Sequence, residues 1–276
     1  MRAKTQARLV VYGLLLALAF WSIAIEPGWV QQRDLTLAAD MPERALTIAV
    51  ASDLHVGAPH VGREALRRLV DRVNAAQPDL ILLPGDFIIR GVIGGETVLP
   101  EAIAADLATL RAPLGVYATL GNHDWGFDGP RVRSALESAG IRVLENEAVA
   151  LSGTALWLVG IGDDMTDHAQ VQTAFAGVPA GTKTIAMLHD PANAPELPPS
   201  ALVAFAGHTH GGQVRLPFIG ALIVPGRAPR AHAYGWIPDV PVPTWVSSGI
   251  GTSILPIRSN CPPEFVVLRL GGKEIS

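Results

Sequence analysis

Short apolar runs alternate with longer amphipathic stretches along most of the chain, from residue 45 onward. Seven of the runs have the length and composition of buried β-strands: 45–51, 80–84, 114–120, 155–161, 184–188, 201–206 and 265–270. Residues 63–76 carry leucine and valine at helical spacing, and 101–110 and 130–139 are further candidate helices. Strands that alternate with helices are typical of an α/β domain, and the short connections of the second half predict that it is richer in strands.

An uncharged apolar segment precedes this domain, from Leu9 to Ile25. The basic residues beside it lie upstream, at Arg2, Lys4 and Arg8. A helix over this segment would extend ~25 Å, just enough to cross the hydrocarbon core of a bilayer. A cleaved signal peptide, with Ser22-Ile23-Ala24 as a weak cleavage site, is the alternative. We favour an uncleaved anchor because the apolar run is longer than is usual in signal peptides.

The predicted organisation is an N-terminal membrane anchor or signal anchor at 1–25, a stalk at 26–44 and one domain at 45–276. Because positively charged flanks stay in the cytoplasm, we expect a single-pass protein of the cell membrane with an extracytoplasmic domain. The lipid bilayer is then a partner. Nucleic acid is not expected as one, since the formal charge of -4 is spread along the chain without a basic cluster. The single cysteine, Cys261, excludes an intrachain disulfide and a thiolate-rich metal site.

Polar residues follow five of the predicted strands at the points where those strands end. They are Asp53 and His55, Asp86, Asn122-His123-Asp124, His189, and His208 and His210. Because ligand-binding groups gather at the carboxyl edge of the sheet in α/β proteins, these side chains predict one common site.

The residue types indicate what this site binds. Four imidazoles, two carboxylates and one carboxamide, without a thiolate, suit divalent Mn, Fe, Zn or Co. Seven ligands are too many for one tetrahedral zinc and suit two ions that share a bridging carboxylate. Such pairs lie ~3.5–4 Å apart and clamp the attacking and leaving oxygens of a phosphoryl group.

The order of these motifs resembles that of calcineurin-like metallophosphoesterases. The matching motifs are Asp53-x-His55, Gly85-Asp86, Gly121-Asn122-His123-Asp124, His189 and Gly207-His208-x-His210. The resemblance covers about residues 45–271 and is greatest to the small bacterial membrane-associated or exported branch, where the last motif is followed by sequences like Gly249-Ile250-Gly251-Thr252-Ser253. It implies a four-layer αββα sandwich of two mixed β-sheets flanked by helices.

The resemblance also implies a role for each motif residue. The first metal ion would be held by Asp53, His55 and His210 and the second by Asn122, His189 and His208, with Asp86 bridging the two. His123 would protonate the departing oxygen, and Asp124 would orient its ring. A hydroxide between the two ions would attack the phosphorus in line. Two divalent ions per chain are therefore expected, with manganese among the candidates.

These roles predict a hydrolase of phosphodiester or pyrophosphate bonds. The anchor favours a membrane-associated, lipid-linked substrate, since confinement to the bilayer raises its effective concentration. A phosphomonoesterase or nucleotide phosphatase that uses the same site is the alternative. A non-catalytic scaffold of the same fold is a further alternative, which we favour less because a scaffold would not need a general acid such as His123. Ser248 stands where relatives tend to carry arginine, which leaves the substrate preference open. The apolar stretch 216–225 either borders an acyl groove or forms a buried β-hairpin.

Some polar residues are expected to have no role in the predicted site. His60, His168 and His232 fall outside the motifs and are predicted to be ordinary surface or loop histidines. Asp163, Asp164 and Asp167 follow a strand end but fit a solvated loop or a helix cap better than a metal site. Cys261 is expected to be an inert buried thiol.

Overall fold

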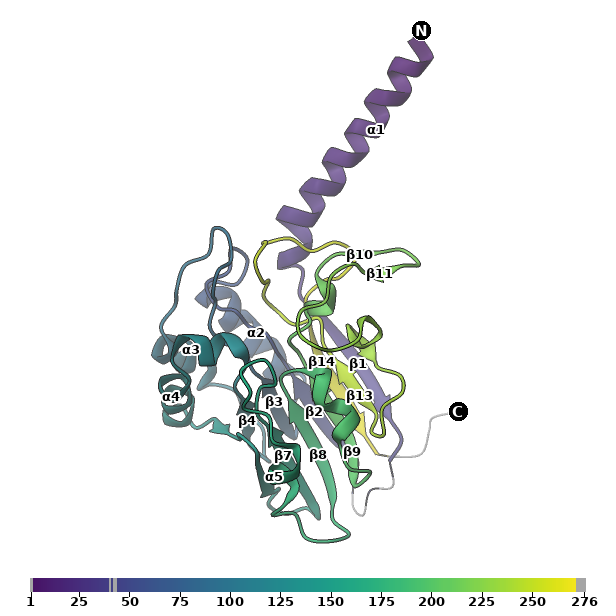
Figure 1. The fold of residues 1–276 in the computed structure, drawn as a ribbon. Helices are drawn as coiled ribbons and strands as arrows, with labels where there is room; N and C mark the ends of the chain where they lie inside the picture. Colours follow the sequence, from purple (N-terminus) through teal and green to yellow (C-terminus); the bar gives the residue numbers. More distant parts are fainter. Residues whose placement is uncertain (1, 40, 42–43, 272–276) are drawn as a thin grey trace.

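A computed structural model describes residues 2–39, 41 and 44–271. Two six-stranded mixed β-sheets make up the domain (Figure 1). The first consists, in spatial order, of β1 (Gln31–Leu37), β14 (Glu264–Leu270), β2 (Leu46–Val50), β3 (Leu80–Pro84), β4 (Val116–Thr119) and β5 (Arg142–Val143). The second consists of β12 (Gly235–Trp236), β13 (Thr244–Val246), β9 (Ala201–Ala206), β8 (Lys183–Leu188), β7 (Leu156–Ile161) and β6 (Glu147–Ala150).

The sheets pack face to face and helices cover their outer faces. Between the sheets, Ile48 and Leu82 share a buried apolar cluster with Leu158, Met187 and Phe205. The outer face of the first sheet packs against α2 (Arg63–Ala75), α3 (Pro100–Leu107) and α4 (Asn122–Ser138). The outer face of the second packs against α5 (Val171–Phe175) and a 3-10 turn at Pro191–Glu196. The αββα sandwich expected from the sequence is therefore confirmed.

The burial of the inner strands explains why the apolar runs in the sequence predict them. β3 and β9 are covered on both faces, so nearly every position is apolar and buried. β2, β3 and β4 run parallel to one another, as do β7, β8 and β9. Their carboxyl ends consequently meet at one end of the sandwich, where the polar residues of the motifs follow.

Helix α4 begins earlier than the sequence predicted, at Asn122 rather than near Pro130. The glycines at 126 and 129 weaken the helical signal of its first turns, and the backbone bends at Asp128, where φ is -173°. The consequence is functional, because Asn122 and His123 lie on the first turn of a helix and not in a loop.

The predicted stalk at 26–44 needs correction. Gln31–Leu37 forms β1, which pairs in parallel with β14 in a register that places Gln31 opposite Glu264. β1 is a largely exposed edge strand, and its polar composition gave no sequence signal for a strand. Only 26–30 separates the N-terminal helix from the sheet.

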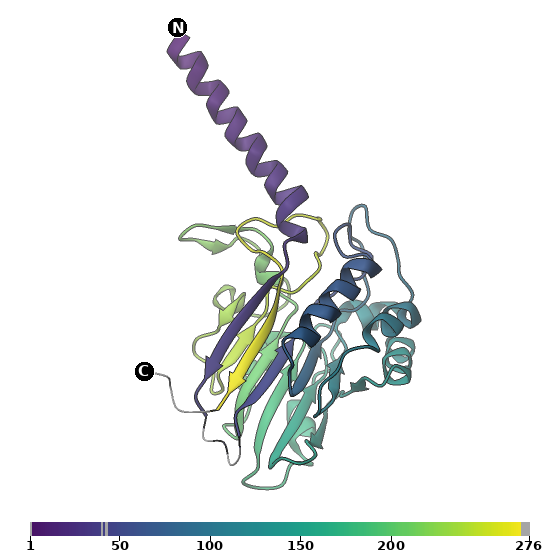
Figure 2. The same ribbon diagram turned by 180° about the vertical axis from the view of Figure 1, so that it is seen from behind.

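The N-terminal helix α1 (Arg2–Phe20) projects away from the domain (Figures 1 and 2). It continues through a π-helical turn at Trp21–Ile25 and a 3-10 turn at Glu26–Gly28. Residues 4–28 are apolar and long enough to cross a membrane, a property that an N-terminal signal sequence shares.

Candidate metal centre

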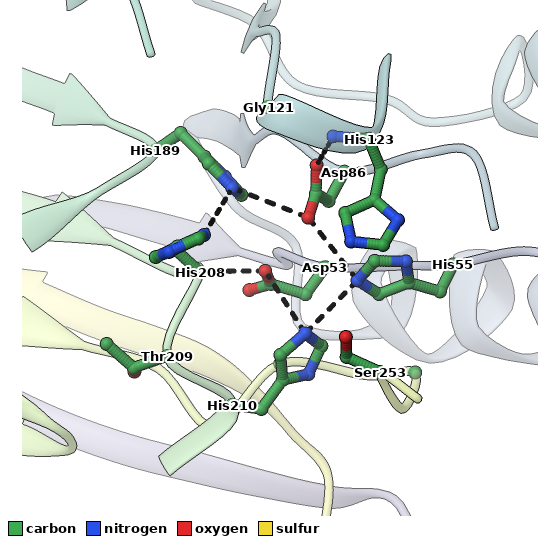
Figure 3. A network of polar contacts seen from close by, with 12 residues as sticks. Asp53, His55, Asp86, Gly121, His123, His189, His208, Thr209, His210 and Ser253 are labelled. Atoms are coloured by element: carbon green, nitrogen blue, oxygen red, sulfur yellow. Dashed lines mark hydrogen bonds and ion pairs between the residues drawn. The ribbon is translucent and has the colours of Figure 1, made fainter. Parts of the chain in front are cut away.

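The motif residues converge at the carboxyl end of the parallel strands (Figure 3). β2 leads into Asp53 and His55, β3 into Asp86, β4 into Asn122 at the start of α4, β8 into His189, and β9 into His208 and His210. Asp53, His55 and His189 are completely buried, and Asp86, His208 and His210 nearly so. The structure thus brings together all seven residues that the sequence predicted as ligands.

One group of side chains gathers around His55. Its Nε2 atom lies 3.1 Å from Nε2 of His210 and 3.4 Å from Oδ2 of Asp86. Nε2 of His210 lies 3.8 Å from Oδ1 of Asp53. Two imidazole nitrogens and carboxylate oxygens at these separations can surround one cation.

A second group gathers around His189. Its Nε2 atom lies 3.2 Å from Nδ1 of His208, 3.3 Å from Oδ1 of Asn122 and 3.4 Å from Oδ2 of Asp86. Nδ1 of His208 is also 3.1 Å from Oδ1 of Asn122. The two groups share one atom, Oδ2 of Asp86, which stands equally far from His55 and His189.

The tautomer of His189 tests whether these residues suit a metal. Its Nδ1 atom lies 2.8 Å from the carbonyl oxygen of Pro84, which can only accept, so Nδ1 carries the proton. In the neutral ring Nε2 would direct its lone pair at the Asp86 carboxylate, and the two would repel unless a proton or a metal ion lay between them. Burial lowers the pKa of His189, but the Asp86 carboxylate outweighs it and the net pKa lies well above the ordinary value. The centre needs positive charge, and its donors fit divalent metal ions.

Burial acts on the other imidazoles in the direction that metal binding requires. It lowers the pKa of His55 to about 4 and that of His208 to about 3. Both rings are therefore neutral at physiological pH and offer a free nitrogen lone pair.

The backbone bends sharply at the strand ends that carry these residues. Asp53, His55, Asp86, His208 and His210 all have positive φ, between 40° and 66°. This left-handed conformation is unfavourable for residues with a side chain and gathers at functional sites. Here it turns five side chains, which follow the strands β2, β3 and β9, toward one another.

Two glycines make room for the acidic residues. A Cβ atom on Gly121 would lie 2.2 Å from Oδ1 of Asp86, and one on Gly207 would lie 2.3 Å from Oδ2 of Asp53. The backbone of both loops therefore approaches the carboxylates more closely than any other residue would allow.

His123 lies at the edge of the centre and is only half buried. Its ring packs edge-on against His55, with centroids 4.6 Å apart, and its backbone N–H donates to Oδ1 of Asp86 over 2.9 Å. Burial lowers the pKa of its imidazole.

The role implied for Asp124 is wrong in this structure. Its carboxylate does not orient the ring of His123; it accepts backbone N–H groups from Asp86, Phe87, Ile88 and Gly121 at 2.8 to 3.0 Å. The cause is the early start of α4, which buries Asp124 under the loop that follows β3. Asp124 therefore shapes the backbone that carries Asp86.

The histidines and aspartates that were not expected to contribute to the site lie outside the two groups of candidate metal ligands. Nε2 of His60 contacts the carbonyl of Ile23, and Nε2 of His232 contacts that of Pro238. His168 stacks on Trp125 with centroids 3.6 Å apart, a contact that the sequence did not predict. The Asp163 carboxylate accepts from the backbone N–H of Thr166, as a local cap does.

The sequence also gave no role to Arg258, which is completely buried. Its guanidinium donates to the carbonyl oxygens of Ser248, Gly249, Gly251 and Cys261. Ser248, the departure from the branch pattern, donates its hydroxyl to the carbonyl of Pro262. Arginine and serine here hold the loop 248–261 together, and the Cys261 thiol beneath it is buried with a raised pKa.

Comparison with known proteins agrees with this geometry. The model of the family described as calcineurin-like phosphoesterase matches residues 46–212, more than half of the chain. The uncharacterized metallophosphoesterase YkuE of Bacillus subtilis is 26% identical over 89% of this chain and 87% of its own length. The phosphodiesterase YaeI of Escherichia coli is 28% identical over 89% and 90%, respectively. The UDP-2,3-diacylglucosamine pyrophosphatase LpxG of Chlamydia trachomatis is 26% identical over 72% and 74%.

A buried cluster of histidines and carboxylates that requires cations thus occupies the part of the chain that the family model covers. The chain belongs to the calcineurin-like phosphoesterase family and is a metal-dependent phosphoesterase.

Proposed function

We propose that this protein hydrolyses phosphodiester or pyrophosphate bonds in a lipid-linked substrate at the membrane surface, using two divalent metal ions. The observation that carries the proposal is the position of Asp86. One of its oxygens lies 3.4 Å from an imidazole nitrogen in each of the two groups of ligands, as a carboxylate that bridges two ions would.

In this proposal Asp53, His55 and His210 would hold one ion, Asn122, His189 and His208 would hold the other, and Asp86 would be shared by both. When bound, the ions supply Lewis acidity and lower the pKa of water to near neutrality. The chain's own groups fix the ligands, since Pro84 holds the tautomer of His189 and Asp124 holds the backbone of Asp86.

His123 is the proposed general acid. It is a half-buried imidazole that lies close enough to His55 and Asp86 for the three to surround a cation, but seven other ligands already suffice for two ions. It would donate its proton to the departing oxygen of the phosphate ester. Burial lowers the pKa of this ring, which makes its protonated form a stronger acid but a smaller fraction of the free enzyme near neutral pH.

A groove beside the centre supports an acyl-bearing substrate. It has a volume of about 450 Å³, begins at His210, and is lined mostly by apolar side chains, including Leu222, Ile223, Ile254, Leu255 and Ile257. Its lining includes Val214 and Leu222, which flank the hairpin of β10 (Arg215–Leu216) and β11 (Gly220–Ala221). The stretch 216–225 is thus a hairpin, but an exposed one. LpxG, whose name specifies a diacylated pyrophosphate, gives this substrate class further support.

A substrate panel tests the proposal. The full-length chain in detergent micelles with added Mn would be offered a lipid-linked pyrophosphate, a soluble nucleotide sugar, a p-nitrophenyl diester and a phosphomonoester. We expect the lipid-linked pyrophosphate to be cleaved with the highest kcat/KM. Release of inorganic phosphate from the monoester at a higher kcat/KM would favour a phosphatase instead.

The Asp86→Asn variant is the negative control for the panel, since it removes the proposed bridge. Activity retained by this variant would indicate a contaminating enzyme.

A further inference from the structure

Large apolar side chains are exposed on loops beside the groove that His210 lines. In the β10–β11 hairpin and the turn after it, Phe218 is fully exposed, and Ile219 and Ile223 are 61% and 78% exposed. In the loop 248–261, Ile254 and Leu255 are 68% and 45% exposed. Such a concentration on a folded domain indicates a surface that contacts an apolar partner.

Hydrogen bonds join these loops to one another. The side chain of Gln213 donates to the carbonyl of Ser253 over 3.0 Å and accepts from the N–H of Ser253 over 2.6 Å. A third loop joins them, because the N–H of Ile93, itself 64% exposed, donates to the carbonyl of Ile254 over 3.0 Å. We call Ile93, Phe218, Ile219, Ile223, Ile254 and Leu255 the apolar rim.

The rim lies at the end of the domain from which α1 projects. Both views show the β10–β11 hairpin and the loop 248–261 beside the lower end of the helix (Figures 1 and 2). The contact between loop and helix is direct, since the N–H of Arg258 donates to the carbonyl of Ser22 over 2.9 Å.

Glu26 fastens the same junction. Its buried carboxylate accepts the N–H of Cys261 over 2.6 Å and the indole N–H of Trp21 over 2.7 Å. The end of α1 is therefore tied to the loop that carries Ile254 and Leu255. A helix that spans a bilayer and is held in this way places the rim at the surface of that bilayer.

We propose that the apolar rim inserts into the leaflet of the lipid bilayer that faces the domain, so that the groove and the metal centre open directly onto the lipid headgroups. The partner is the bilayer itself, and the argument for it is continuity with the apolar helix. The proposal rests on the proposed retention of α1 in the membrane but not on the identity of the bond that is cleaved. A domain held in this way would keep a fixed orientation relative to the bilayer, whereas a domain held by a flexible tether would tumble freely.

Site-directed fluorescence on the full-length chain tests this. The variants Phe218→Cys and Ile254→Cys would be labelled with an environment-sensitive dye and reconstituted into vesicles of phosphatidylcholine and phosphatidylglycerol. The matched control is Gln172→Cys, an exposed position on α5, at the end of the domain remote from α1. The unsubstituted chain, whose Cys261 is buried, gives the background labelling.

We expect blue-shifted emission at positions 218 and 254 and several-fold stronger quenching there by acyl-chain nitroxide lipids than at position 172. Introducing Phe218→Asp together with Ile223→Asp should abolish the quenching of a label at position 254. Equal, water-like emission at all three positions would overturn the proposal. Blue-shifted emission without quenching by lipid would also overturn it, since a second copy of the chain would then cover the rim.

The readout needs no turnover, so it separates this inference from the proposed function. Insertion of the rim without cleavage of lipid-linked substrates would support the membrane-contacting surface and contradict the proposed substrate. Cleavage of lipid-linked substrates without insertion would support the proposed substrate and contradict the membrane-contacting surface.

Discussion

The backbone N–H of Asp86 donates to the carboxylate of Asp124 over 2.8 Å. The bridging ligand of the proposed metal pair is therefore positioned by a residue that is not itself a proposed metal ligand. The same carboxylate accepts from Phe87, Ile88 and Gly121, and it is completely buried. Four donors converge on two oxygens, which is the full acceptor capacity that one carboxylate offers.

Asp124→Asn should therefore weaken metal binding. An amide supplies one acceptor oxygen, and its NH2 group would face backbone donors, so the loop carrying Asp86 must shift. We expect metal affinity to fall by roughly 10–100-fold, the range typical of residues that support metal ligands. Calorimetric titration with Mn measures this. Asp71→Asn, on the exposed face of α2, is the control and should bind Mn like the unsubstituted chain.

Removal of the metals should abolish activity. Treatment with a chelator takes away the Lewis acid, and Mn, Co or Zn should restore turnover because imidazole and carboxylate ligands accept each of them. Asp86→Asn should be among the most damaging single substitutions, since it weakens the charge shared by both ions. Full activity in a sample shown by elemental analysis to be metal-free would falsify the mechanism.

His123→Ala should separate chemistry from metal binding. The variant should retain both metals, while turnover of substrates with poor leaving groups falls by roughly 10²–10⁴-fold. The loss should be smaller for p-nitrophenyl esters, whose leaving group departs without a proton. Elemental analysis and parallel kinetics on the two substrates check this, and loss of metal from the variant would assign His123 to the ligand set instead.

Glu145 should make stability depend on pH. Burial raises its pKa to about 7, although the backbone N–H of Leu120 donates to it over 2.7 Å. The folded state thus holds this proton more tightly than the unfolded chain, whose pKa is near 4.5. Stability contributed by the protonated form is complete below the unfolded pKa and falls as pH rises through the folded pKa.

Glu145→Gln keeps the acceptor for Leu120 and removes the charge. We expect the variant to exceed the parent in stability only slightly near pH 5, and by roughly 1–3 kcal/mol near pH 8. The metal-loaded protein is used for both, so that only the Glu145 contribution differs. Equal stability of the two proteins near pH 8 would mean that Glu145 is ionised without penalty.

The N-terminal segment should stay on the mature protein. The carbonyls of Ser22 and Ile23 accept hydrogen bonds from Arg258 and His60, so the weak cleavage site is part of the folded domain. N-terminal sequencing of membrane-extracted protein should find residues 1–25 intact. A reporter fused after residue 276 should work only outside the cytoplasm; one that works only in the cytoplasm would reverse the predicted topology.

The inner strands and the ligands they carry could be predicted from the sequence, because both faces of β3 and β9 are covered and the apolar runs end abruptly at polar residues. β1 could not, since an exposed edge strand has no apolar pattern and its partner β14 lies at the other end of the chain. Nor could the role of Asp124, whose partners are backbone N–H groups that look alike in every residue. The roles of Arg258 and Glu26 depend on carbonyl and amide positions in the same way.

The pairing of β1 with β14 sets the order in which the molecule can be completed. Gln31 meets Glu264, so the strand that follows α1 finds its neighbour only after the rest of the domain has been synthesised. Closing so long a loop is slow relative to local structure formation. A ribosome-bound or truncated chain that lacks residues 264–270 would present β1 with an open edge, exposed to proteases and to other unfinished chains. Quality control of this protein should therefore act on β14, long after α1 has left the ribosome.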